Sequence, residues 1–186
     1  MLARPHLSIA AQRRRLITKP DSSFLQDVVA PKVIDAMRAA SRALSQAGVR
    51  HSVVGGLAVG ANGYPRATKI VDFLVGSEAF EHHPGGLVTL KQGVPFQVNG
   101  VAIDFLSIGP GEEFLESELE DAEGSFVGAA PLVYLKLKAS RLRDQADVLE
   151  LIKSSLDIDA CRRYLQANAP DLLPRFDDLV ARAETE

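Results

Sequence analysis

The chain is poor in cysteine, in long apolar runs and in net charge, and each shortage excludes a class of protein. Cys161 is the one cysteine among 186 residues, which excludes an internal disulfide and a zinc site built from several cysteines. No apolar run approaches the roughly 18 residues that a membrane-spanning helix needs. The formal net charge of −3 provides no overall field for gripping nucleic acid, so any contact with RNA or DNA would have to use a local basic patch.

The rest of the composition is that of an ordinary globular chain. With 46% hydrophobic and 24% charged residues, it is long enough for one good core. We therefore predict a single domain over 25–186, with a helical region from about residue 131. The first 20 residues carry five basic side chains and no acid, and their apolar segment LSIAA is too short for a secretory signal. We expect a basic tail over 1–24, flexible or loosely docked, and a cytoplasmic protein without a membrane partner.

Several helices can be placed from apolar spacing and from start and stop signals. Pro31 is a typical first helical residue, and apolar positions recur from there at helical spacing up to Gly48. An acidic helix with a solvated face is predicted over 112–123. Two further helices are predicted over about 157–167 and 171–184, the first started by Asp157.

Residues 51–75 hold the densest pattern of candidate site residues. A short apolar strand runs into Gly55-Gly56, a small-residue helix follows, and after the segment PRATK a second strand is predicted over 70–75 with one acid, Asp72. Glycines let backbone N–H groups approach an anion at a helix N-terminus, and a carboxylate offers hard oxygens to Mg²⁺. This layout can hold a phosphate and a metal close together, although a tight turn into a packed helix needs glycine equally often.

A second acid lies on a later strand, which follows a hairpin signal. Asn99-Gly100 is a typical two-residue turn, and it leads into a strand predicted over 101–106 that carries Asp104. A carboxylate among apolar neighbours costs free energy to bury unpaired. We therefore expect Asp104 and Asp72 each to be exposed at a cleft, hydrogen-bonded or bound to a cation.

The helix predicted from Pro131 and the segment after it combine leucines with basic residues. This basic cluster is a candidate for contacting a triphosphate or an RNA backbone. The same pattern is typical of an amphipathic helix whose lysine stems cover apolar surface. Asp144, further on, is well placed as the N-cap of the next helix. The basic residues of the cluster are Lys136, Lys138, Arg141 and Arg143.

Taken together, these motifs over roughly residues 50–153 resemble the nucleotidyltransferase superfamily with the DNA-polymerase-β-type palm, and most closely its abortive-infection, AbiEii-like toxin branch. The resemblance implies an α/β (α+β) fold: a mixed β-sheet palm with an N-terminal helix and a C-terminal helical region. It implies an NTP substrate, Mg²⁺ as cofactor, and an acceptor hydroxyl on RNA or on a partner protein. It implies Asp72 and Asp104 as metal-binding catalytic residues and Lys136 as a catalytic cation. The residues that it assigns to the triphosphate are Gly55, Gly56, Arg66, Thr68 and Lys138.

One position departs from the family pattern. Where the family carries the first acid of Asp-x-Asp, this chain has Ile70, and residues two apart on a strand share a face. A two-metal site needs enough carboxylate oxygens for two ions about 4 Å apart, whereas Asp72 and Asp104 alone would hold one ion loosely or none. Three functions therefore stay open: a working nucleotidyltransferase, a degenerate relative that has lost the activity, and a non-catalytic toxin–antitoxin or regulatory protein-binding module.

Overall fold

The computed structural model describes residues 19–154 and 156–186. Most of the predicted basic tail, residues 1–18, lies outside the described residues. The part of that segment that is described ends in a short 3-10 helix, η1 (Ser22–Leu25), which packs against α2 (Gly55–Ala61) through the buried Leu25.

A four-stranded mixed sheet forms the centre of the fold, in the order β1-β2-β6-β5. β1 (His51–Val53) runs antiparallel to β2 (Val71–Val75), and β2 runs parallel to β6 (Val101–Ser107). The predicted Asn99-Gly100 turn joins β6 to the antiparallel β5 (Gln97–Val98), with positive φ at both turn residues. A separate hairpin pairs β3 (Phe80–His82) with β4 (Val88–Leu90).

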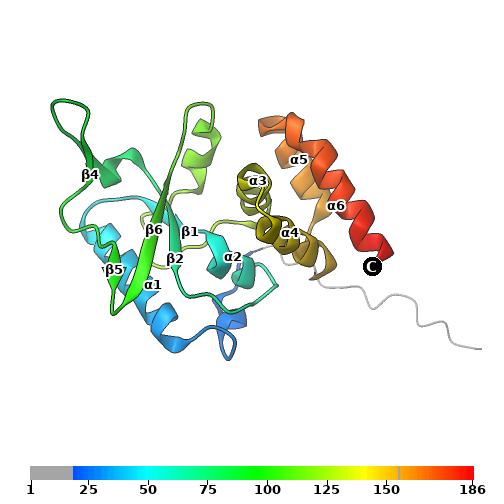
Figure 1. Ribbon diagram of the computed structural model, residues 1–186, viewed down its shortest axis with the longest axis horizontal. Coiled ribbons are helices and arrows are strands. Elements are labelled where there is room, and N and C mark those ends of the chain that lie inside the picture. Colours follow the sequence, from blue (N-terminus) through cyan, green and yellow to red (C-terminus); the bar gives the residue numbers. More distant parts are fainter. Residues whose placement is uncertain (1–18, 155) are drawn as a thin grey trace, which may run out of the picture.

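Helix α1 (Pro31–Gln46) covers one face of this sheet (Figure 1). Pro31 is its first residue, and its apolar stripe packs against alternate residues of the strands, as a period of two requires. Val71, Phe73 and Ile103 point into this core. Their neighbours Asp72 and Asp104 must therefore point to the opposite face of the sheet.

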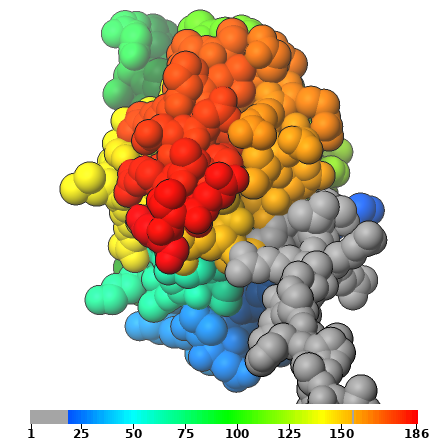
Figure 2. Space-filling view, turned by 90° about the vertical axis from the view of Figure 1, so that its right-hand side faces the viewer, coloured from blue at the N-terminus to red at the C-terminus, as the bar shows by residue number. Residues whose placement is uncertain are grey.

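The helical region lies beyond α2 on that opposite side, where Figure 1 shows α3 (Ala129–Ala139) next to α4 (Leu142–Ser154). A second core joins this region to Leu74 of β2. The last two helices, α5 (Ile158–Asn168) and α6 (Leu173–Thr185), pack on α3 and α4 and cover the upper part of the outer face in Figure 2. The chain is thus an α+β protein with a mixed sheet, an N-terminal helix and a C-terminal helical region, as predicted.

Two local predictions have different outcomes. Asp157 caps α5 as expected, because its carboxylate accepts from the backbone N–H of Ala160 at 2.9 Å. The predicted acidic helix over 112–123 is wrong, since only a 3-10 segment, η3 (Glu113–Glu118), forms there. The chain leaves the helical conformation after this segment because Glu120 forms an antiparallel backbone bridge with His51 of β1 instead. Among the described residues, no helix is long and apolar enough to cross a membrane.

Candidate nucleotide and metal site

Asp72 and Asp104 lie directly opposite each other on the parallel pair β2 and β6. Neighbouring strands are about 4.8 Å apart, so two side chains in register on one face are close neighbours. Both acids point away from the core under α1, because the residues on either side of each fill that core. The two strands that were predicted to carry one acid each therefore lie side by side in the sheet.

Asp72 is the more enclosed of the two acids, and its surroundings oppose its charge. Burial raises the pKa of the Asp72 carboxyl above its usual range, and the nearby charge of Asp104 raises it further. Lys136, a backbone hydrogen bond from Gly56 and Arg141 pull the pKa in the other direction. The rise persists in spite of these three groups because burial, its largest cause, disfavours the charged form of the carboxyl.

The glycine pair at the start of α2 is required by close packing on both sides. Gly55 has φ +62°, and a Cβ there would lie 2.0 Å from Oδ2 of Asp72. A Cβ on Gly56 would lie 3.2 Å from both Nη1 of Arg66 and Oγ1 of Thr68. The two glycines therefore let the carboxylate of Asp72 and the guanidinium of Arg66 approach the same backbone turn closely.

These residues line one cavity of about 640 Å³ beside strands β2 and β6. Its walls carry five basic and three acidic side chains, an excess of two positive charges. All of the predicted site residues except Lys138 are among the lining residues, which are Gly55, Gly56, Arg66, Ala67, Thr68, Lys69, Ile70, Asp72, Asp104, Lys136, Arg141, Arg143 and Asp144.

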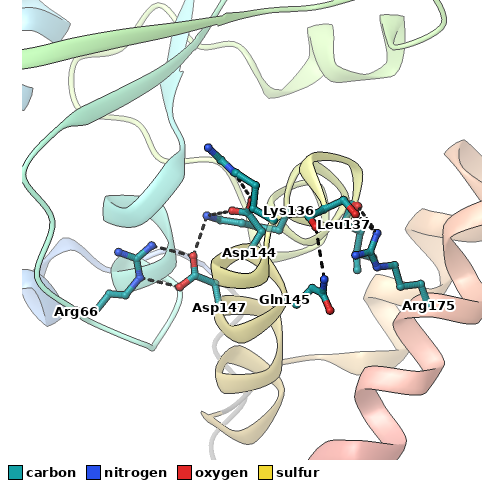
Figure 3. A network of polar contacts seen from close by, with 9 residues as sticks. Arg66, Lys136, Leu137, Asp144, Gln145, Asp147 and Arg175 are labelled. Atoms are coloured by element: carbon teal, nitrogen blue, oxygen red, sulfur yellow. Dashed lines mark hydrogen bonds and ion pairs between the residues drawn. The ribbon is translucent and has the colours of Figure 1, made fainter.

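Lys136 is the centre of a buried ion-pair network that includes Asp144 and Asp147 (Figure 3). Its ammonium lies 2.8 Å from Asp144 Oδ1 and 2.8 Å from Asp147 Oδ2. Arg66 reaches across from the segment before β2 and donates twice to Asp147, from Nε at 2.7 Å and from Nη2 at 2.8 Å. Arg141 donates from Nε to the other oxygen of Asp144 at 2.7 Å.

The sequence did not reveal the role of these two acids. Asp144 is not the N-cap that its position suggested, because it lies inside the first turn of α4 and accepts from Lys136 and Arg141. Asp147, three residues further along α4, accepts from Arg66 and pairs with Lys136. The available signal was their spacing: residues three apart on a helix share a face, so a partner of one can also contact the other. Although burial raises the pKa of Asp147, the ion pairs with Arg66 and Lys136 hold it below its usual range.

Lys138 lies apart from the cavity. Its ammonium is 2.6 Å from Oε1 of Glu112, which also accepts from the hydroxyl of Tyr134. Residues two apart on a helix do not face the same way, so Lys136 and Lys138 of α3 cannot both face the acids. The structure does not bring Lys138 together with the other predicted phosphate-binding residues.

Ile70 is the last residue before β2 rather than the first residue of the strand. It lines the same cavity as Asp72, with 39% of its surface exposed, and its backbone carbonyl accepts from Thr68 Oγ1 at 3.3 Å. It brings no donor for a metal to the cavity. Within residues 19–154 and 156–186, no group of three or more histidine, cysteine, aspartate or glutamate side chains is arranged to hold a metal ion.

The similarity of the chain to known proteins is weak. No family model matches the chain, and no curated protein matches it. It is similar to the crystal structure of an antigenic nucleotidyltransferase-like protein from Paracoccidioides brasiliensis, with 15% sequence identity and a TM-score of 0.43 over 83% of this chain and 95% of that one. A TM-score this low carries no information about function, so any functional conclusion has to come from the cavity itself.

Proposed function

We propose that the chain is a nucleotidyltransferase of the DNA-polymerase-β-palm type, close to the AbiEii-like branch, and that its cavity binds an NTP together with one Mg²⁺. The observation that carries this proposal is the register pair Asp72 and Asp104 at the floor of a cavity whose other charged groups are mostly basic. Two adjacent carboxylates and a surrounding positive field are what a metal-bound polyphosphate requires.

The donor set fits one Mg²⁺ and not two. Mg²⁺ is commonly held by one or two carboxylates together with substrate phosphates and water, which Asp72 and Asp104 can supply. The raised pKa of Asp72 supports this fit, because a bound cation would favour the charged form that burial and the charge of Asp104 disfavour. A second ion would need an acid at the position of Ile70. The bound ion would supply charge stabilisation at the phosphates.

The chain's own residues position the substrates in this proposal. The phosphates lie against Gly55-Gly56, Arg66 and Thr68, and the positive charge of Lys136 helps to neutralise them. An acceptor hydroxyl on RNA or protein approaches from the side of Asp104, the more exposed acid. Its oxygen bonds to the α-phosphorus while its proton passes to the carboxylate of Asp104, the α–β anhydride bond breaks, and pyrophosphate leaves.

The alternatives from the sequence lead to different measurements. Ile70 in the cavity wall favours a degenerate enzyme that binds nucleotide without transferring it. A non-catalytic toxin–antitoxin or regulatory module would need neither nucleotide nor metal. Calorimetry with each NTP, with and without Mg²⁺, and a labelled-nucleotide transfer assay on total RNA and protein separate the three.

Variants of the acids sharpen the test. Asp72→Asn and Asp104→Asn should each abolish the Mg²⁺-dependent part of NTP binding, because each removes a charged oxygen donor from the register pair. Asp178→Asn, at an exposed position on α6, is the matched control and should bind like the unaltered protein. If no NTP binds with or without Mg²⁺, the nucleotidyltransferase proposal is wrong; binding without transfer identifies the degenerate form.

A further inference from the structure

Two arginines line the cavity from separate segments of the chain, and each is held by a buried carboxylate. Arg66 comes from the segment between α2 and β2, and Arg141 comes from the corner between α3 and α4. Asp147, which holds Arg66, and Asp144, which holds Arg141, are each only 2% exposed. A carboxylate that is both buried and doubly bonded fixes the direction of its guanidinium far better than a surface acid does.

The hydrogen bonds that hold the arginines leave their terminal nitrogens available. Arg66 uses Nε and Nη2, and its Nη1 lies against Gly56, beside the start of α2. Arg141 uses only Nε, and 77% of its side chain remains exposed. Within the part of the chain that is described, neither Nη1 of Arg66 nor the terminal nitrogens of Arg141 have a hydrogen-bonded acceptor. Each guanidinium therefore has donors left for an anion.

Lys136 connects the two holding carboxylates. It is 7% exposed, and two of its three N–H donors are committed to Asp144 and Asp147. Lys136 can therefore offer at most one donor to a ligand, while its charge keeps both buried acids ionised and in place.

The corner that carries Arg141 is fixed from a third element. Ser140 has φ +65°, and its hydroxyl accepts from Nη1 of Arg175 on α6 at 2.5 Å (Figure 3). The same nitrogen of Arg175 donates to the carbonyl of Leu137 at 3.3 Å. Arg175 of α6 thus helps to fix the corner from which Arg141 projects.

We propose that Arg66 and Arg141 form a two-arginine clamp for the non-reacting phosphates of the ligand, and that Asp144, Asp147 and Lys136 are positioning residues that aim the clamp. This inference rests on the proposed function, since it assigns the phosphate end of the same cavity. It differs in needing no metal: the clamp binds a polyphosphate chain through guanidinium groups alone.

The test uses the full chain and inorganic triphosphate, titrated by calorimetry without divalent ions. Asp147→Asn and Asp144→Asn should each weaken triphosphate binding about tenfold or more, the factor that corresponds to roughly 1.4 kcal/mol, close to one charge-assisted hydrogen bond. Asp177→Asn is the control, because Asp177 accepts from Arg162 Nε at 2.8 Å in an exposed pair between α5 and α6. It should leave triphosphate binding unchanged.

A chemical rescue separates aiming from general structural support, and it also covers the case in which the aspartate variants fold poorly. Arg66→Ala removes one arm of the clamp and leaves the carboxylate of Asp147 facing a hole of guanidinium shape. Guanidinium ion at millimolar concentration should restore triphosphate binding, whereas sodium at the same ionic strength should not. In the double variant Arg66→Ala/Asp147→Asn the rescue should disappear, because no carboxylate remains to seat the added ion.

The outcomes distinguish this inference from the proposed function. Triphosphate binding that is equally strong in Asp144→Asn, Asp147→Asn and Arg66→Ala overturns the clamp while leaving the nucleotide site intact. Binding of NTP with Mg²⁺ but not of triphosphate alone also overturns the clamp. Failure of the unaltered protein to bind either ligand overturns both proposals.

Discussion

Replacing Ile70 by aspartate should convert a weak metal site into a stronger one. Ile70 lines the same cavity as Asp72 and is the last residue before β2, so a carboxylate there adds a third acid to the register pair. At 4 Å, unit charges attract by about 1 kcal/mol in a water-like medium, so a new carboxylate and a divalent ion gain about 2 kcal/mol. We expect roughly a 30-fold increase in Mg²⁺ affinity.

The cost in stability is modest because Ile70 is 39% exposed. Loss of its partly buried side chain should lower the free energy of unfolding by about 1–2 kcal/mol. Ile70→Asn is the matched control: it has the same size and the same stability cost as Ile70→Asp, but no charge. Calorimetric Mg²⁺ titration and the nucleotide-transfer assay should show a gain only for Ile70→Asp.

Two results would refute this reasoning. One is an Ile70→Asp protein that binds Mg²⁺ no better than Ile70→Asn does. The other is strong Mg²⁺-dependent transfer by the unaltered protein that Asp72→Ala abolishes and Ile70→Asp leaves unchanged. In that case the missing acid was never needed, and the degenerate reading is wrong.

Three further predictions concern stability. Gly55→Ala should destabilise the fold by more than the roughly 1–2 kcal/mol that a left-handed backbone costs a non-glycine residue, because its Cβ would also clash with the carboxylate of Asp72. Gly124→Ala, with φ +71° and nothing within 4 Å, should cost only the backbone part. Equal shifts in melting temperature would contradict this prediction. Lys136→Met should lower the free energy of unfolding by roughly 3–5 kcal/mol, because it removes the shared partner of two buried acids. Lys138→Met should lower it by only roughly 0–1 kcal/mol. Similar losses for the two variants in denaturant titrations would contradict the stabilising role of the ion-pair network. Burial lowers the pKa of His51 below its ordinary value of 6.5, so the unfolded chain binds the proton more readily. Stability should therefore fall as pH drops below about 6.5, and His51→Gln should flatten this decline. The absence of any decline in the unaltered protein would contradict the prediction.

The strands and their acids could be predicted because their signals are local. The turn at Asn99-Gly100 sets the register of its hairpin, and the period of two then determines which face carries Asp104. The pairing of β2 with β6 is different in kind, because it joins residues about thirty positions apart. No local pattern in the sequence sets a pairing between strands this far apart.

The ion-pair network could not be predicted from the sequence. Asp144 was predicted as an N-cap because aspartate is common at helix starts. Only the packing of α4 against α3 buries it beside Lys136. Asp147 meets Arg66 across 81 positions of sequence, a contact that no spacing rule anticipates. Lys138 was expected at the phosphate site together with the other basic residues, but helical geometry turns it toward Glu112.

The most direct test of the nucleotide and metal site is a crystal structure of the full chain with Mn²⁺ and a non-hydrolysable NTP. Mn²⁺ takes the same oxygen donors as Mg²⁺ and can be located by its anomalous signal. We predict one anomalous peak in contact with both Asp72 and Asp104, and phosphates against Gly55-Gly56 and Arg66. Nucleotide bound in another part of the molecule, with no peak at the two acids, would contradict the proposed site.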